Sequence, residues 1–218
     1  MEISGLRERK KVETRRTIID VALRLAVERG PNHVTVEDIA ASAGVSPRTV
    51  FNYFGTKDEA ILGIDAESRV ENIQNLRSRP PDEPPLVSLH VVLRDRITTV
   101  DKAGEYWRTR AQLVRDHPQL RAAQVAAQLA MEHDLSEVIA ERCGLNVTED
   151  LYPSLVVSVA LAALRLALGR PASAQIEGLR EEIDAAFKHL ADGLSRPTPS
   201  GQSLPRATEA GAPAGPQR

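Results

Sequence analysis

The stretch that decides the fold spans residues 34–62 and reads V-T-V-E-D-I-A-A-S-A-G-V-S-P-R-T-V-F-N-Y-F-G-T-K-D-E-A-I-L. Its pattern predicts two short helices joined by a tight turn and followed at once by a third helix. Thr35 and Asp38 stand three residues apart, a variant of the capping box that begins a helix. Gly44 lies where that helix must end, because glycine adopts a left-handed backbone most easily.

The second of these helices carries a polar outer face. Ser46 is a typical cap residue, and Pro47 suits the first helical position because its missing N–H leaves no hydrogen bond unmade. Val50 and Phe54 lie four residues apart and face the first helix, where the small Ala40 permits a close crossing. The outward side chains are Arg48, Thr49, Asn52 and Tyr53. Side chains of these types hydrogen-bond to base edges and phosphates, so this face predicts DNA reading.

This stretch resembles the DNA-binding domain of the TetR family of transcriptional regulators. The shared features are a capped helix, the A-G-V-S turn, a short recognition helix that ends in an aromatic-x-Tyr-Phe run, and the lysine that follows. The resemblance is strong over residues 12–65 and elsewhere extends only to the all-helical layout. It implies base contacts from Arg48, Thr49 and Asn52. The full set of residues expected at DNA is Thr35, Ser46, Pro47, Arg48, Thr49, Asn52, Tyr53 and Lys57. Many family members carry Tyr where this chain has Phe51, which has no hydroxyl for a phosphate and is expected in the core.

Charge is distributed unevenly along the 218 residues. Residues 1–58 hold ten Lys and Arg against eight Asp and Glu, a net charge of +2, whereas the whole chain has −2. The stretch 7–16 alone carries +4, which predicts a basic segment beside a phosphate backbone. The sequence begins without an apolar segment, so the expected location is the cytoplasm.

An all-α fold is predicted, in which a three-helix helix-turn-helix DNA-binding domain joins a larger helical ligand-binding and dimerisation domain. The expected boundaries are a basic N-terminal arm at 1–11, the helix-turn-helix domain at 12–56, the effector-binding and dimerisation domain at 57–195 and a disordered tail at 196–218. The first helix is expected over about 12–29, and a connector helix from 56 or 57 to about 77. Beyond the loop P-P-D-E-P-P, apolar periodicity predicts five more helices, at about 86–102, 105–117, 119–142, 148–168 and 174–195.

The last two of these helices predict a homodimer. Between residues 155 and 168 only Ser158 and Arg165 are polar, so this helix needs cover on several sides. In the final helix apolar residues recur every three or four positions, which indicates a packing seam. A four-helix bundle with a second copy would bury both helices, and completion of a monomeric core is the alternative. The family resemblance favours the dimer. The residues expected at its interface are Leu155, Val159, Ala162, Leu166, Leu179, Ile183, Phe187 and Leu190.

The resemblance also implies an effector pocket in the larger domain. The residues expected to line it are Trp107, Arg110 and Met131, and the long Ala-, Leu- and Val-rich helices would wall an apolar cavity. The recognition run and the sequence from 110 to 121 resemble an actinobacterial branch of acyl-CoA-responsive and mycofactocin-type regulators. A long-chain acyl-CoA is therefore the expected effector. Arg110, Arg115 and Arg121 are either its phosphate partners or solvated surface residues.

No motif predicts an enzyme. The sequence has no Gly-rich phosphate loop, no His-Glu-x-x-His, no nucleophile elbow and no Cys-x-x-Cys, and no cofactor or metal is expected. His133, Glu137 and Glu141 recur every four residues, a spacing that suits a metal site but is typical of a solvated helix face.

The predicted function is that of a ligand-responsive DNA-binding regulator, a repressor that a small apolar effector releases from a palindromic operator. One alternative is a helix-turn-helix regulator with a different effector, such as a drug-like or other hydrophobic molecule. Another is a ligand-independent DNA- or protein-binding module. The sequence leaves open the effector, the operator with its spacing, the regulated genes and the choice between repressor and activator.

Overall fold

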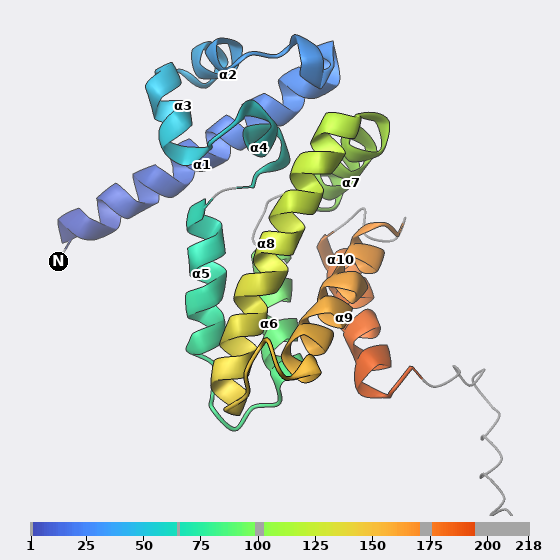
Figure 1. Cartoon of the computed structure of the whole chain (residues 1–218). Coiled ribbons are helices and arrows are strands. Elements are labelled where there is room, and N and C mark those ends of the chain that lie inside the picture. The colour runs from blue at the N-terminus through green and yellow to red at the C-terminus, as the bar shows by residue number, and fades with distance from the viewer. Residues whose placement is uncertain (1, 65, 99–102, 171–175, 195–218) are drawn as a thin grey trace, which may run out of the picture.

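The computed structural model describes residues 2–64, 66–98, 103–170 and 176–194, and within these ranges the regular structure is all helical (Figure 1). The fold class expected from the sequence is confirmed. In chain order the elements are α1 (Glu2–Arg29), the short 3₁₀ helix η1 (Pro31–His33), α2 (Val36–Ala43), α3 (Pro47–Tyr53), α4 (Lys57–Leu62), α5 (Ala66–Arg77), α6 (Pro85–Thr98), α7 (Ala103–Asp116), α8 (Pro118–Cys143), α9 (Leu151–Leu168) and α10 (Ile176–Ala191).

The caps of α2 and α3 form as the sequence predicts. The Thr35 hydroxyl accepts a hydrogen bond from the Asp38 amide at 3.1 Å, and the Asp38 carboxylate accepts one from the Thr35 amide at 3.0 Å. Hydrogen bonds from Thr35 lower the pKa of Asp38, which keeps this carboxylate ionised beside the helix N-terminus. Gly44 ends α2 with φ 67°, and the Ser46 hydroxyl accepts from the Thr49 amide at 3.1 Å. The turn between the two helices is therefore fixed at both ends.

Two hydrophobic cores hold the helices together. The N-terminal core gathers apolar side chains from α1 to α4, with Ile18, Ile39 and Phe54 at its centre, and the effector core gathers those of α5, α6, α8, α9 and α10. Leu113 of α7 and Leu120 of α8 lie in the N-terminal core although their helices belong to the larger half of the chain. The corner between α7 and α8 therefore joins the two halves.

The first helix begins earlier than predicted. Residues 2–11 were expected as an arm, with the helix from about 12, but α1 starts at Glu2. These residues contain no proline and are mostly charged, and charged residues such as Glu, Lys and Arg favour helix. Lys11 pairs with Glu67 at the start of α5, and Arg15 also approaches Glu67 at 3.4 Å. Part of the basic segment therefore faces acidic residues of the chain itself.

The connector between the two halves is two helices, which corrects the prediction of a single one. Gly63 ends α4 with a left-handed backbone, φ 59°, and donates its N–H to the Ala60 carbonyl at 3.2 Å. The Ile64 amide donates to the Glu59 carbonyl at 2.9 Å, so α4 closes with the hydrogen bonds of a glycine C-cap. The prediction missed this end because apolar periodicity continues across it.

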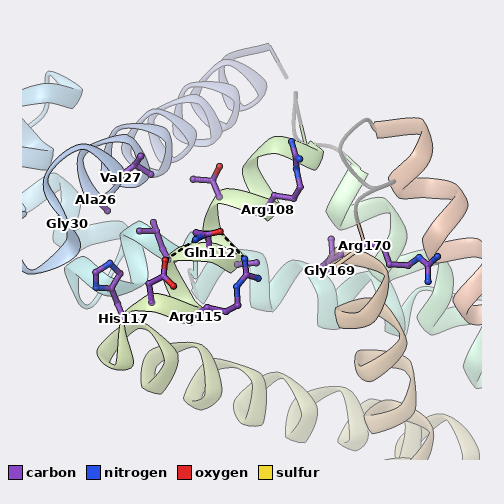
Figure 2. Close-up of a pocket in the computed structure, with 14 residues that line it drawn as sticks. Ala26, Val27, Gly30, Arg108, Gln112, Arg115, His117, Gly169 and Arg170 are labelled. Atoms are coloured by element: carbon purple, nitrogen blue, oxygen red, sulfur yellow. Dashed lines mark hydrogen bonds between the residues drawn. The ribbon is translucent and has the colours of Figure 1, made fainter.

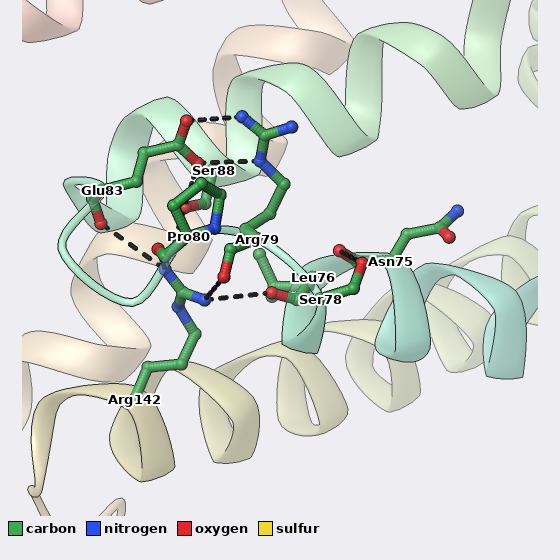
Figure 3. A network of polar contacts seen from close by, with 8 residues as sticks. All are labelled: Asn75, Leu76, Ser78, Arg79, Pro80, Glu83, Ser88 and Arg142. Atoms are coloured by element: carbon green, nitrogen blue, oxygen red, sulfur yellow. Dashed lines mark hydrogen bonds and ion pairs between the residues drawn. The ribbon is translucent and has the colours of Figure 1, made fainter.

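The loop between α5 and α6 is anchored by Arg142 of α8 (Figure 3). Its guanidinium donates to the carbonyl oxygens of Leu76 at 3.3 Å, Arg79 at 3.0 Å and Pro80 at 2.8 Å. Within the loop Arg79 binds Glu83, and hydrogen bonds from Arg79 and then Ser88 lower the pKa of Glu83 to about 2. The side chain of Arg142 thus binds a carbonyl of the last turn of α5 and two carbonyls of the loop that follows it.

Helix α9 has the length and composition of a membrane span, with a mean hydropathy of 1.9 over Leu151–Leu168. Such a helix is weak evidence for a membrane, since the core helix of a soluble protein has the same character. Here 44% of the segment is buried, and α9 packs against α6, α8 and α10. Its apolar composition is accounted for in part by this packing.

Candidate DNA-reading and effector sites

Helix α3 presents the residues that the sequence predicted for DNA. Val50 is buried, with Arg48 and Asn52 exposed and Thr49 and Tyr53 half-buried. The hydroxyls of Ser46 and Thr49 lie 2.8 Å apart and share a hydrogen bond at the start of the helix. Arg48 and Asn52 lie four residues apart, so their side chains share one face of the helix. This exposed face has the donors and acceptors that base edges bind.

Phe51 contradicts its prediction. It was expected in the core, but 56% of the side chain is exposed. The buried positions of this segment are Val50 and Phe54, and one further residue along a helix turns the side chain by about 100°. Phe51 therefore adds an exposed aromatic ring to the recognition helix, next to Asn52 in sequence.

Lys57 has a structural role that the sequence did not reveal. Its ammonium nitrogen donates to the carbonyl oxygens of Pro31 at 2.7 Å and Val34 at 3.0 Å, and so ties the start of α4 to the segment before α2. An ammonium group has three N–H donors, so one is left over from these two bonds. A contact with a phosphate would have to use that remaining donor.

The predicted effector residues lie at the effector core. Trp107 and Met131 pack against it, and Arg110 is buried with 7% of its surface exposed. The Arg110 guanidinium donates to the Gln124 amide oxygen at 2.6 Å and lies over the Trp107 ring, 4.7 Å from its centroid. The Trp107 ring also meets the ring of Tyr106 edge to face, with centroids 4.9 Å apart.

Tyr106 and Trp107 link the two cores. Tyr106 packs against the N-terminal core, whereas its neighbour Trp107 packs against the effector core. The Tyr106 hydroxyl fills the space that a Cβ on Gly63 would occupy. A side chain of α7 therefore rests directly on the break between α4 and α5. Sequence reasoning missed this contact, for which the only signal was a glycine inside an apparently continuous helix.

A cleft of about 660 Å³ lies on the other side of α7, between α1 and the end of α9 (Figure 2). Arg115 lines it and donates to Gln112 at 3.1 Å, and Gln112 in turn donates to Asp116 at 3.1 Å. Arg110 does not line the cleft and donates to Gln124 instead, and the guanidinium of Arg121 donates to the Arg115 carbonyl at 2.6 Å. The three arginines considered as phosphate partners therefore do not converge on one site.

The predicted dimer residues divide between two environments. On α9, Leu155 and Leu166 are 50% and 69% exposed, and Val159 and Ala162 are half-buried between them on the same face. On α10 the seam faces inward. Leu179, Ile183 and Phe187 are buried in the effector core of their own chain, and Leu190 packs against it. Leu179, Ile183 and Phe187 correct the prediction, because a side chain buried within the chain has no free surface for a second copy, whereas the half-buried Leu190 stays a candidate interface residue.

Acidic residues of α8 pair with arginines of α5. Over the described residues no three His, Cys, Asp or Glu side chains gather as ligands. Glu141 instead pairs with Arg77 at 3.1 Å. Nearby, a hydrogen bond from Arg69 lowers the pKa of Asp134. This face of α8 is therefore used for ion pairs with α5.

Two family models match the chain. Residues 18–62 match the model of bacterial regulatory proteins of the tetR family, and residues 83–195 match that of the MftR C-terminal domain. The chain belongs to the TetR family of transcriptional regulators. Members of the TetR family are ligand-responsive DNA-binding proteins and not enzymes.

Two curated relatives support this assignment, and each is matched over most of its length. The HTH-type transcriptional regulator TcmR of Streptomyces glaucescens is 31% identical over 196 residues, which are 87% of this chain and 86% of TcmR. MftR of Mycobacterium tuberculosis, named for mycofactocin biosynthesis, is 26% identical over 196 residues, 86% of this chain and 94% of MftR.

Solved structures share the fold. The fatty acid degradation regulator FadR from Bacillus halodurans has a TM-score of 0.55 at 19% identity, covering 84% of this chain and 97% of FadR. The complex of SmeT with triclosan has a TM-score of 0.53 at 21% identity, covering 89% and 100%. Likeness at this level of identity concerns the fold alone.

Proposed function

We propose that this TetR-family regulator is a cytoplasmic homodimeric repressor, which a small apolar effector releases from a palindromic operator. The observation that carries the proposal is the α3 face, where Arg48 and Asn52 are exposed on a helix fixed by caps at its start. Bidentate pairing of Arg with guanine or of Asn with adenine contributes about 1–3 kcal/mol of discrimination at each base pair. Thr35, Ser46, Pro47 and Tyr53 frame this face as candidate backbone contacts.

The dimer rests on α9. A single recognition helix reads few bases, and a two-fold pair of them would enter successive major grooves about 34–36 Å apart in the simplest arrangement. The exposed stripe from Leu155 to Leu166 is apolar and needs cover. Leu166→Glu is therefore expected to break the dimer and the operator complex together. Val70→Glu, at another exposed apolar position on α5, is the matched control and should leave both intact.

Effector and operator would be coupled through α7. An effector between the helices around Trp107 would displace Tyr106, which rests on Gly63 between the DNA-binding helices and α5. A shift at this break would alter the spacing of the two recognition helices. Because linkage is reciprocal, operator DNA must weaken effector binding by the same factor, typically about 5–150-fold.

A long-chain acyl-CoA is the proposed effector. The support is an apolar core beside Trp107 and Met131, together with the sequence resemblance to acyl-CoA-responsive regulators described above. The fold that the chain shares with FadR, a fatty acid degradation regulator, is compatible with it. SmeT has the same fold in complex with triclosan, so a drug-like apolar molecule is the second candidate.

The test is release of an operator obtained by randomised-site selection. Acyl-CoA thioesters of increasing chain length are titrated against the protein–operator complex, with free CoA and free fatty acid as controls. Release that depends on chain length, while light scattering shows an intact dimer, is the expected result. If no chain length moves the complex, the acyl-CoA assignment is wrong. If every molecule that binds the larger domain leaves operator affinity unchanged, the coupling scheme is wrong as well.

A further inference from the structure

The indole N–H of Trp107 is a buried donor that no contact described so far uses. Within the described chain nothing accepts a hydrogen bond from it. A buried donor without an acceptor destabilises a protein, and native structures hold few of them. The Trp107 indole therefore lacks a partner that accepts its hydrogen bond.

Trp107 differs from the other side chains with a buried, unpartnered polar atom. Arg142 has further N–H donors that are paired, the Arg94 Nε lies 2.9 Å from an Asp184 carboxylate oxygen in an ion pair, and Asp58 has a second carboxylate oxygen. The amide of Asn72 can exchange its nitrogen and oxygen by a flip, so its missing bond depends on an assignment. The indole has one polar atom and one donor direction. Its entire hydrogen-bonding capacity is unused.

The direction of this donor is fixed by the neighbouring side chains. The guanidinium of Arg110 covers one part of the ring at 4.7 Å and is itself held by Gln124. Tyr106 meets the ring at an interplanar angle of 84°. A cation beside the ring favours electron-rich groups and disfavours cationic ones, since like charges repel strongly where water is excluded. The missing partner therefore has the chemistry of a carbonyl or carboxylate oxygen.

We infer that the effector of this regulator carries an oxygen acceptor that binds the Trp107 indole N–H beside the Arg110 guanidinium. The inference rests on the proposed function, because it assumes an apolar effector at the effector core. It narrows the effector class to apolar chains with a carbonyl or carboxylate head and excludes apolar amines.

The experiment uses full-length protein and three probes of equal chain length: dodecanoate, dodecanoyl-CoA and dodecylamine. Trp107 is the only tryptophan of the chain, so the ¹⁵N–¹H spectrum contains a single indole resonance. We expect both acceptor probes to move it downfield, as a new hydrogen bond does, and dodecylamine to leave it in place. Trp107→Phe keeps a ring for Arg110 and removes the donor. It should weaken binding of the acceptor probes about tenfold in calorimetry.

Tyr152→Phe, which removes a hydroxyl from an exposed ring of α9, is the matched control and should retain affinity for the acceptor probes. If dodecanoyl-CoA binds and releases operator while the indole resonance stays in place, this inference fails and the proposed function stands. Magnetisation transfer from water to the indole in the free protein, with no response to any probe, would assign the missing partner to a water molecule and overturn the inference. If none of the three probes binds, both the acyl effector and this inference fail.

Discussion

Replacement of Gly63 by alanine tests the contact between α7 and the break in the connector. Two separate effects are expected. A left-handed backbone destabilises a residue with a Cβ by about 1–2 kcal/mol, and Gly63 has φ 59°. The new methyl group would also overlap the Tyr106 hydroxyl, and overpacking of this kind destabilises by about 1–3 kcal/mol. The combined loss in the free energy of unfolding is therefore about 2–5 kcal/mol.

Gly144→Ala separates these two effects. Gly144 has a similar φ of 65°, but no atom lies within 4 Å of its would-be Cβ, so only the backbone effect of about 1–2 kcal/mol should be seen. Urea unfolding of both variants, of Tyr106→Phe and of the Gly63→Ala, Tyr106→Phe pair gives a double-mutant cycle. The pair should recover most of the overpacking loss, since Phe lacks the hydroxyl that clashes. Equal losses for the two glycine variants, or strict additivity in the cycle, would refute the contact.

Three further changes test the DNA face and the polar loop. Arg48→Ala should relax sequence preference at one or two operator positions in a randomised-site selection and leave the unfolding midpoint unchanged, because Arg48 is exposed; an unaltered preference removes it from the reading set. Lys57→Ala should lower both the unfolding midpoint and the affinity for all sequences, since Lys57 bonds to the Pro31 and Val34 carbonyls, and the salt slope should fall by about one unit only if its third donor meets a phosphate. The pKa of Glu83 is lowered, so its ion pair stabilises the fold above the ordinary pKa of 4.5 and this stabilisation is lost as pH falls to about 2. In Glu83→Gln the free energy of unfolding should fall less steeply between pH 4.5 and about 2 than in the unmodified protein. An unchanged pH dependence would contradict the assignment.

The parts of the fold that are decided locally could be predicted from the sequence. Thr35, Gly44 and Ser46 each act within four residues of their hydrogen-bond partners, so their roles can be deduced from spacing alone. The end of α4 at Gly63 is also local, but the apolar residues on both sides continue the helical period and hide it. Glycine is the stronger signal here, because its left-handed conformation ends a helix whatever the periodicity.

Other features depend on contacts that spacing does not specify. The spacing of apolar residues from Leu179 to Phe187 predicts that one face of α10 is buried. It does not tell which elements cover that face, and in the structure these are α6 and α9 of the same chain. In the same way, the four-residue spacing of Val50 and Phe54 predicts two core positions correctly. Phe51 was assigned to the core by residue type alone, and it is exposed. The bond from Lys57 to Pro31 spans 26 residues and has no counterpart in any local pattern.

Leu113 and Leu120 limit where this gene can be recombined with those of its relatives. Both leucines complete the N-terminal core from the α7–α8 corner, so a fusion made after α4 would leave the transplanted helices without two of their buried side chains. Leucine-to-alanine losses in cores are about 2–5 kcal/mol each, which is comparable to the whole stability of a small domain. A chimera that exchanges DNA specificity should therefore carry residues 113–120 from the donor of the helix-turn-helix, or keep the recipient's core and graft only the outer face of α3.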